Sequence, residues 1–294
     1  MSTSPYATLR RFNRAWTQRV GVLHESFLGS GRPLGPARLL FEIGPDGAGV
    51  LALRRRLGLD SGYLSRLLRQ LADEGLVEVA PDPVDRRRRL ATLTARGLRE
   101  WRELDDRSER LARDLVAPLS PSQRARLDEA LATAELLVRA ATLDLEVVPA
   151  DSPEALWAVG SYFAELDQRF PGGFDPGDAL TADVPAYAPP HGCFVVARDE
   201  DRVVACGGVQ RLSVDTAEIK RMWVHPDWRG AGLGSRMLRH LEDEAARRGH
   251  RRVRLDTNGV LAEAIAMYGR AGYRPIGRYN DNPYAQAWFE KALT

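Results

Sequence analysis

The chain has 294 residues, of which 44% are hydrophobic, and a formal net charge of +2. This length predicts about two domains, each with enough apolar residues to form a core. No apolar run approaches the roughly 20 residues of a membrane-spanning helix, and the N-terminus lacks the charged and apolar regions of a signal peptide. We therefore expect a cytoplasmic protein that does not bind membranes.

The two cysteines, Cys193 and Cys206, lie in separate apolar runs. They form neither a CxxC pair nor a Cys/His pattern, so they predict no zinc site and no disulfide framework. Buried free thiols fit a reducing compartment. We expect no metal in this protein.

Residues 49–74 predict two helices joined by a tight turn. The apolar residues of 49–57 give a short helix, and the turn at 58–61 offers Asp60 or Ser61 as the N-cap of the next helix. In that second helix, leucines recur at helical spacing and arginines lie on the opposite face. This order is typical of a helix-turn-helix motif, whose second helix reads DNA. The residues expected to contact bases are Ser61, Tyr63, Ser65, Arg66 and Arg69.

Residues 77–93 predict a two-stranded hairpin, the wing of a winged helix. Its tip carries Arg86, Arg87, Arg88 and Arg89, and arginine is favoured in the negative potential of a minor groove. Taken alone, an arginine run is usually a solvated loop, and any amphipathic surface helix carries charges on its outer face. The succession of the two elements is what favours DNA binding.

With these motifs in order, the first half resembles the MarR family of dimeric winged-helix regulators over about residues 5–142. The resemblance includes Asp85-x-Arg87, followed by Leu93-Thr94 and Gly97. It implies that Asp85 and Arg87 pair to hold the wing, and that the other tip arginines reach DNA.

The resemblance also implies a homodimer. Its interface would be formed by the first helix, about Tyr6–Phe27, and the last helix, about Arg99–Ala140. Leucines of the last helix supply a long apolar stripe, although a lone domain would use the same stripe internally.

The pattern of apolar residues changes near Leu143, where runs typical of β-strands begin to alternate with helical patterns. This change predicts a domain boundary, with a mainly α winged helix-turn-helix domain at 1–142 and an α/β domain at 143–294. The expected strands lie at 143–148, 193–197, 203–209, 218–224 and 252–256, and a helix is expected at 153–167.

A glycine-rich turn at 229–234 lies between an expected strand and an expected helix. Backbone N–H groups at a helix start lack partners and carry positive potential, and glycines let an anion approach, so the turn suits a pyrophosphate. Gly-Lys-Ser/Thr is absent, which excludes a Walker loop. The spacing Arg229-x-x-Gly232-x-Gly234 after Val224-x-Pro226 resembles the acetyl-CoA signature of the GNAT superfamily of N-acetyltransferases, and the resemblance extends over about residues 143–294.

The GNAT resemblance implies a mixed, splayed central sheet that admits the pantetheine arm of acetyl-CoA, the cosubstrate. The arm would pair with the backbone of Met222, Trp223 and Val224 like an added strand. Asn258 is a further candidate ligand of the arm. The pyrophosphate would lie on Arg229, Gly230, Ala231, Gly232, Leu233, Gly234 and Ser235.

Transfer to an amine requires a base for the ammonium group and a proton donor for the thiolate. Tyr268, in Ala-x-x-x-Tyr-x-x-x-Gly-Tyr, matches the tyrosine that the family points at the thioester sulfur. Glu218 matches a strand position that the family often uses as base. The alternatives are a core tyrosine and a strand carboxylate paired with Lys220 or an arginine.

The acceptor is less well specified by the sequence. The segment 277–284 contains Asn280, Asn282 and Tyr284, whose polar groups suit a small amine or an amino-acid-like acceptor. The region 170–192, rich in Pro, Gly and Asp, predicts a flexible lid.

We therefore predict a transcriptional regulator and an N-acetyltransferase in one chain, with double-stranded DNA, acetyl-CoA and a small amine as partners. One alternative is a regulator whose GNAT domain senses acetyl-CoA or an amine without turnover. Another is an acetyltransferase that keeps the winged helix only for dimerisation. Glu218 and Tyr268 favour catalysis over the first alternative, and the outward arginines favour DNA binding over the second.

Overall fold

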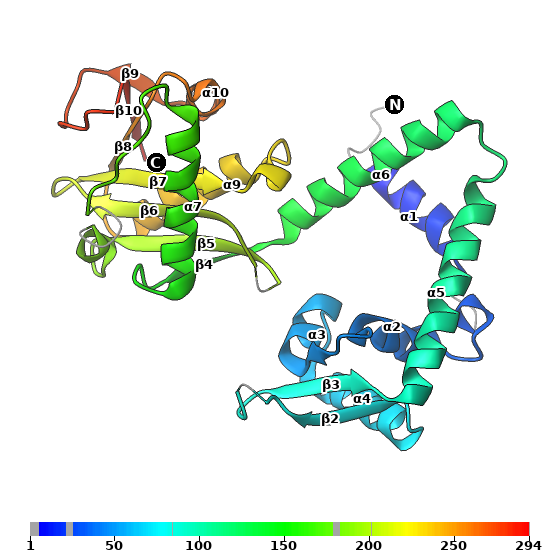
Figure 1. Ribbon diagram of the computed structural model, residues 1–294. Helices are drawn as coiled ribbons and strands as arrows, with labels where there is room; N and C mark the ends of the chain where they lie inside the picture. Colours follow the sequence, from blue (N-terminus) through cyan, green and yellow to red (C-terminus); the bar gives the residue numbers. More distant parts are fainter. Residues whose placement is uncertain (1–5, 22–25, 84, 179–182, 201, 294) are drawn as a thin grey trace. The chain divides into compact units, whose positions relative to one another are not determined.

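The structure is a computed structural model that describes residues 6–21, 26–83, 85–178, 183–200 and 202–293. The chain divides into two compact units, Met1–Asp128 and Glu129–Thr294 (Figure 1). The division falls within a helix, α6 (Pro121–Thr142). Within the described ranges, no helix is both long and apolar enough to cross a membrane.

The first unit is mainly helical, with one small sheet in the strand order β1-β3-β2. Its strands pair in antiparallel fashion, Ala48 with Ala91 and Val77 with Leu93, so the wing hairpin has a third strand on one side. The elements are α1 (Ala7–Arg19), η1 (Phe27–Gly29), α2 (Leu34–Ile43), β1 (Ala48–Gly49), α3 (Val50–Leu57), α4 (Ser61–Asp73), β2 (Val77–Pro81), β3 (Arg89–Leu93) and α5 (Ala95–Val116).

The helix-turn-helix expected at 49–74 is confirmed as α3 and α4. Gly58 ends α3 in the left-handed conformation, with φ of 62°, and the Asp60 carboxylate starts α4 by accepting the Tyr63 N–H at 2.9 Å. The leucine stripe of α4 is buried against leucines of α2 and α3. Its members are Leu64, Leu67, Leu68 and Leu71.

The single helix expected from Arg99 to Ala140 is wrong, because the structure has two helices, α5 and α6. Pro121 lacks a backbone N–H, so it is tolerated in the first turn of a helix and breaks a helix interior. Ser120 and Gln123 cap the new helix reciprocally: Ser120 N–H donates to the Gln123 side chain at 2.9 Å, and Gln123 N–H donates to Ser120 Oγ at 3.3 Å. The first helix, expected over Tyr6–Phe27, ends at Arg19, and residues 22–25 of that span lie outside the described residues.

The second unit is built on a seven-stranded sheet in the order β4-β5-β6-β7-β8-β10-β9. All neighbouring strands are antiparallel except β7 and β8, which are parallel, so the sheet is mixed. Its strands are β4 (Asp144–Val148), β5 (Cys193–Asp199), β6 (Arg202–Arg211), β7 (Thr216–Val224), β8 (Arg252–Thr257), β9 (Arg274–Ile276) and β10 (Ala287–Ala292). The other elements are α7 (Pro153–Arg169), η2 (Val184–Tyr187), η3 (Pro226–Trp228), α9 (Leu233–Arg247) and α10 (Ala262–Arg270).

Helices α7 and α9 cover opposite faces of this sheet (Figure 1). In β5, Phe194 and Val196 belong to the core that contains α7, whereas Val195 and Ala197 belong to the core that contains α9. A strand buried on both faces has apolar residues in succession and no polar alternation. This is why the sequence of β5 is a continuous apolar run.

Candidate functional site

Strands β7 and β8 separate part of the way along their length. They are paired only where Thr216–Glu218 of β7 face Arg252–Arg254 of β8, although β7 continues to Val224 and β8 to Thr257. Near this point Arg221 has a φ of 56°, and the register between β6 and β7 shifts between Cys206 and Gly208. Such an irregularity bends a strand and increases its twist. The splay that the GNAT resemblance implies is therefore present.

Beyond the splay, β7 remains paired on its β6 side, where Val224 faces Ala205 and Trp223 faces Cys206. The opposite edge of β7 borders the gap. An open strand edge offers backbone N–H and C=O groups to an extended ligand. These are the backbone groups that the sequence assigns to the pantetheine arm.

The glycine turn leads from β7 into α9. Gly230 and Gly232 have φ values of 78° and 79°, a left-handed conformation that side chains other than glycine rarely adopt. Helix α9 makes its first backbone bond from Arg236 N–H to Gly232 C=O at 3.0 Å. The N–H groups ahead of Arg236 thus form an unsatisfied helix start, which fits a pyrophosphate. The side chain of Leu233 is buried in the core, so only its backbone suits this role.

The guanidinium of Arg229 lies against the end of β7. It donates to the Val224 carbonyl at 3.1 Å and forms an ion pair with Glu165 of α7. Glu165 also accepts the Trp223 indole N–H at 2.9 Å. Glu165 therefore fixes the end of β7. The sequence alone did not point to this residue. A contact between Arg229 and phosphate stays a prediction.

A cavity of about 470 Å³ opens beside the splay. Its walls come from α7, the segment after α7, β7, the C-terminal end of β8, α10 and the loop before β10. Tyr268 of α10, Asp256 of β8 and Lys220 of β7 all line it. These side chains come from different elements, and the cavity brings them together.

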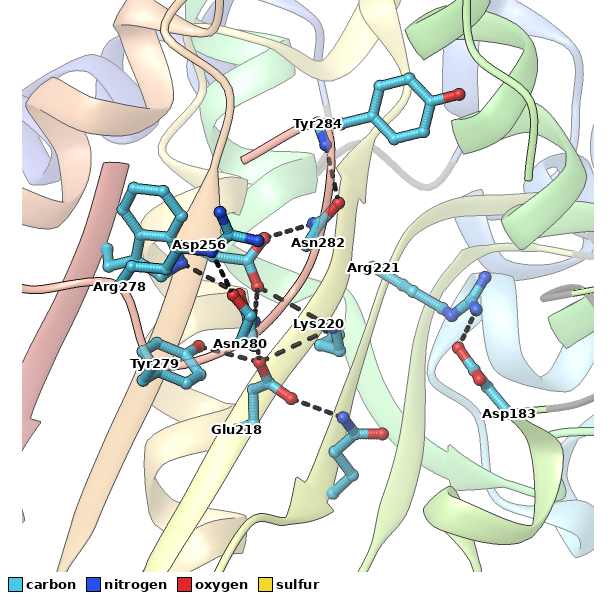
Figure 2. A network of polar contacts seen from close by, with 12 residues as sticks. Asp183, Glu218, Lys220, Arg221, Asp256, Arg278, Tyr279, Asn280, Asn282 and Tyr284 are labelled. Atoms are coloured by element: carbon cyan, nitrogen blue, oxygen red, sulfur yellow. Dashed lines mark hydrogen bonds and ion pairs between the residues drawn. The ribbon is translucent and has the colours of Figure 1, made fainter. Parts of the chain in front are cut away.

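Glu218 and Asp256 are buried carboxylates joined by one network of polar contacts (Figure 2). Glu218 accepts hydrogen bonds from Gln210 at 2.6 Å, from the Tyr279 hydroxyl at 2.8 Å and from Asn280 at 3.1 Å. Asn280 also donates to Asp256 at 2.9 Å. These hydrogen bonds, together with the ammonium group of Lys220 near both carboxylates, hold the two acids in place.

The predicted acceptor residues belong to this network. Asn282 donates to Asp256 at 2.5 Å, so Asn280 and Asn282 together fasten the loop before β10 to β8. Tyr284 faces the other way: its ring packs on Phe174 with centroids 4.7 Å apart, and its hydroxyl accepts the Asp175 N–H at 3.0 Å. Phe174 and Asp175 of the expected lid region are thereby tied to the loop. Residues 179–182 of that region lie outside the described residues.

Asn258 lines the cavity, but its side chain is engaged in the chain's own turn. Its Nδ2 donates to the Tyr284 carbonyl at 2.7 Å, and its Oδ1 accepts the Val260 N–H at 3.0 Å. These bonds stabilise the turn after β8. A bond from Asn258 to the pantetheine arm stays a prediction.

Tyr268 is both a core residue and a cavity residue. Its ring lies 5.8 Å from that of Tyr273 and 5.9 Å from that of Phe289, and the side chain also lines the cavity. Burial, and to a lesser degree the charge of Asp256, raises the pKa of the Tyr268 phenol above its ordinary value. A tyrosine phenol is protonated at neutral pH even without this shift, and burial favours the protonated form further.

In the first unit, the residues predicted to read DNA are exposed on α4. Arg66 lies over the ring of Tyr63, with its Cζ 5.7 Å from the centroid, and the Ser65 hydroxyl donates to the Ser61 carbonyl at 2.7 Å. These contacts leave one polar face along the helix. The exposed residues are Ser61, Tyr63, Ser65, Arg66 and Arg69.

The four wing arginines, Arg86–Arg89, are also exposed. Asp85 forms its ion pair with Arg88 at 3.3 Å, and Arg87 contributes only its backbone N–H to Asp85 at 3.1 Å. The pairing expected between the Asp85 and Arg87 side chains is thus replaced by one with Arg88. A turn brings residue i+3 back toward residue i, which favours this partner.

Gly97, the glycine that follows Leu93-Thr94 in the MarR-like motif, has a steric reason in this unit. A Cβ at this position would lie 2.0 Å from the Leu76 carbonyl oxygen, so only glycine lets α5 approach the strand that begins the wing. Thr94 caps the same helix by accepting the Gly97 N–H at 3.0 Å. This explains why Thr94 and Gly97 occur together in the motif.

Comparison with known proteins agrees with both halves. A model of the acetyltransferase (GNAT) family matches residues 161–273, and a model of the MarR family matches residues 31–88. An IAA acetyltransferase from Azospirillum brasilense is 35% identical over 144 residues, which are 46% of this chain and 91% of the relative. The N-alpha-acetyltransferase RimI from Mycobacterium tuberculosis is 32% identical over 119 residues, which are 39% of this chain and 72% of the relative.

Several other relatives are matched over 32% to 66% of their own length. Among solved structures, an acetyltransferase of the GNAT family from Staphylococcus aureus Mu50 covers 51% of this chain and 100% of its own, with 16% identity and a TM-score of 0.46. The chain belongs to the GNAT family of acetyltransferases, with a MarR-type domain before the catalytic fold. It is an N-acetyltransferase that uses acetyl-CoA.

Proposed function

We propose that this protein is a DNA-binding regulator that also acetylates a small amine or an amino-acid-like acceptor. The DNA-binding part extends over residues 1–142 and the acetyltransferase part over 143–294. The observation that carries the enzymatic half is the cavity beside the splayed strands, because Tyr268 and Asp256 line it together. A proton donor and a carboxylate are the two groups that amine acetylation requires.

The residues around the splay fit acetyl-CoA, which supplies an acetyl thioester when it is bound. The open edge of β7 holds the extended arm, and the helix start at Gly230–Ser235 holds the phosphates. Gly230 and Gly232 keep the turn in its left-handed conformation. Arg229 adds positive charge beside it.

In the reaction, a bond forms between the acceptor nitrogen and the acetyl carbon, and the carbon–sulfur bond breaks. Tyr268 gives its phenolic proton to the departing sulfur. A carboxylate takes the proton that leaves the acceptor nitrogen. A tyrosine phenol is protonated at neutral pH, so Tyr268 carries its proton when the sulfur departs.

Two carboxylates are candidates for the base. Asp256 is a lining residue of the cavity, whereas Glu218 is not among the described residues that line it. We therefore assign direct contact with the acceptor to Asp256, and Glu218 positions Lys220 and the 279–280 segment. The alternative is that Glu218, the base expected from the sequence, acts through a water molecule.

The test is a CoA-release assay with the full chain and a panel of amino acids, polyamines, aminoglycosides and peptides. We expect at least one class of amine to release CoA. Asp256→Asn should lower kcat more than Glu218→Gln, with acetyl-CoA binding retained in both variants. Loss of turnover only in Glu218→Gln would return the base role to Glu218, and absence of turnover with every amine would contradict this function.

The regulatory half of the proposal rests on exposed cations. Arg66 and Arg69 on α4 and the wing arginines form two basic elements in the order of a winged helix. We expect the full chain to bind double-stranded DNA in a fluorescence anisotropy titration, with affinity that falls as salt rises. Salt-independent binding, or none, would contradict this role.

A homodimer completes the regulatory proposal. Helix α1 exposes Leu9, Phe12 and Trp16, and Tyr6 just before it is exposed as well; Phe12 and Trp16 stack with centroids 6.1 Å apart. Exposed apolar side chains at helical spacing are typical of a helix that packs against a partner. Light scattering on the purified chain should give twice the 32.6 kDa of one chain.

A further inference from the structure

The two cationic side chains that line the cavity, Arg221 and Lys220, differ in the number and strength of the contacts that hold them. Arg221 forms an ion pair with Asp183 (Figure 2). It also donates to the Tyr187 hydroxyl at 3.0 Å and lies 4.7 Å from the centroid of Phe163. Its guanidinium is therefore held in the wall. Lys220, the other cation that lines the cavity, is held less tightly.

Lys220 Nζ lies 3.6 Å from Glu218 Oε1 and 3.8 Å from Asp256 Oδ1. A hydrogen bond from nitrogen to oxygen spans about 2.7–3.2 Å, so both contacts are ion pairs without a hydrogen bond. These are its ion-pair partners among the residues that the structure describes. The three N–H donors of the ammonium group thus remain available to an anion in the cavity.

The carboxylate of Asp256 can accept further hydrogen bonds from a ligand. Its Oδ1 accepts Asn280 at 2.9 Å and its Oδ2 accepts Asn282 at 2.5 Å. A carboxylate offers about four acceptor positions, so two remain for a ligand. Asp256 and Lys220 therefore present opposite charges 3.8 Å apart on one cavity wall. This arrangement suits a ligand in which an ammonium group and a carboxylate are neighbours.

Another part of the cavity lining consists of aromatic rings. Phe174 lies 5.3 Å from Phe163 and 5.9 Å from Phe170, and 4.7 Å from Tyr284, measured between ring centroids. All four rings line the cavity. Small-molecule sites combine an apolar wall for the body of the ligand with a few polar groups that orient it.

We propose that the acceptor is a free α-amino acid with a large apolar side chain. Asp256 receives its ammonium group, Lys220 binds its α-carboxylate, and the rings of Phe163, Phe170, Phe174 and Tyr284 contact its side chain. This inference rests on the proposed acetyltransferase function at the same cavity. A peptide N-terminus has the ammonium group but no neighbouring carboxylate, so it would leave Lys220 without a ligand.

The test uses the full chain with four acceptors: L-phenylalanine, L-phenylalaninamide, 2-phenylethylamine and L-alanine. We expect kcat/KM for L-phenylalanine to exceed that for each of the others by about tenfold or more, the usual effect of losing one charge-assisted hydrogen bond or a large apolar contact. An equal or higher value for the amide would indicate a peptide N-terminus as acceptor and overturn the inference.

A variant checks the role of the lysine. Lys220→Met removes the charge and keeps the length of the side chain, and Arg274→Met, an exposed residue of β9 outside the cavity lining, is the matched control. The ratio of kcat/KM for L-phenylalanine to that for 2-phenylethylamine should fall about tenfold in Lys220→Met and stay constant in Arg274→Met. The ratio is taken between two acceptors within one variant. The difference in basicity between the two amines is therefore the same in every variant and cancels when variants are compared.

The outcomes separate this inference from the function on which it rests. An unchanged ratio in Lys220→Met, with acetyl-CoA binding retained, would overturn the carboxylate contact while acetylation itself stands. Equal kcat/KM values for 2-phenylethylamine and L-phenylalanine in the wild-type chain would also overturn the carboxylate contact. If no amine releases CoA, the proposed function fails and the inference fails with it.

Discussion

The two units of this protein use their charged residues in opposite ways. In the first unit the cations of α4 and the wing are exposed, and the side chain of Arg88 is 74% exposed even within its ion pair. In the second unit the side chains of Glu218 and Asp256 are 4% and 5% exposed, and they accept three and two hydrogen bonds respectively. The exposed charges of the first unit can attract a ligand over a distance, whereas the buried charges of the second unit are held in a fixed geometry.

Each arrangement suits the ligand that we propose for it. A DNA backbone is a dense row of phosphates in water, and exposed arginines attract it over distance and release its counterions. Acetyl transfer depends on groups that are already oriented when the reaction begins, in a site from which water is largely excluded.

The largest effect is expected at the proton donor. Tyr268→Phe should lower kcat by about 10²–10⁴-fold, the usual contribution of a positioned acid. Acetyl-CoA affinity should change little, because the ring keeps its packing against Tyr273 and Phe289. Steady-state kinetics and calorimetric titration with acetyl-CoA measure the two quantities, and a wild-type rate would remove Tyr268 from the mechanism.

A smaller effect is expected at the recognition helix. Arg66→Ala should cost about 1–3 kcal/mol of discrimination between a selected DNA sequence and random duplex, since arginine pairs specifically with guanine. Arg110→Ala, an exposed arginine of α5, is the control. Anisotropy titrations with both duplexes measure the ratio. Equal loss of affinity for both would reassign Arg66 to phosphate contact.

Alkaline pH should destabilise the second unit, which holds both cysteines of the chain. Burial raises the pKa of the Cys193 thiol to about 11 and that of Cys206 to about 12. Above about pH 9 the unfolded chain loses these protons before the folded one, so stability present below pH 9 declines as pH rises, by on the order of 1 kcal/mol per pH unit for each thiol.

Urea unfolding at several pH values, followed by the fluorescence of the second unit's tryptophans, measures this decline. Cys206→Ala should make the dependence between pH 9 and 11 shallower, because one of the two protons no longer contributes. A steeper dependence in the variant would contradict the assignment to this thiol.

The smallest effect is expected at the wing. Arg88→Ala should weaken binding to all duplexes alike and reduce the slope of log affinity against log salt by about one unit. The loss of the Asp85 ion pair costs little, because that pair is exposed. A sequence-dependent loss would show that the wing reads shape or bases and would weaken the contrast between helix and wing.

The elements that the sequence predicted well are those set by short-range patterns. The leucine stripe of α4, its cap at Asp60 and the glycine turn before α9 each depend on neighbours within a few residues. The break between α5 and α6 had a readable signal as well, since Ser120-Pro-Ser-Gln123 is a capping box with proline in the first turn. An apolar stripe on both sides of this signal concealed it.

The parts that the sequence analysis missed depend on long-range pairing. Glu165 meets Trp223 and Arg229 across about sixty positions of the chain, and Asp256 meets Asn280 and Asn282 only because the loop before β10 folds back on β8. Nothing in the local pattern around Asp256 distinguishes it from other acids at strand ends.

The spacing of residues along the chain was enough to predict the two folds, the glycine turn that we propose for phosphate and the tyrosine that we propose as the acid, because neighbours within one helix or one turn fix where those groups point. Three features became visible only in the folded chain: which carboxylate borders the cavity, which partners hold Lys220 and Arg221, and that aromatic rings line part of it. They could not be predicted because the order of strands in the sheet, and not distance along the chain, determines which buried charges meet.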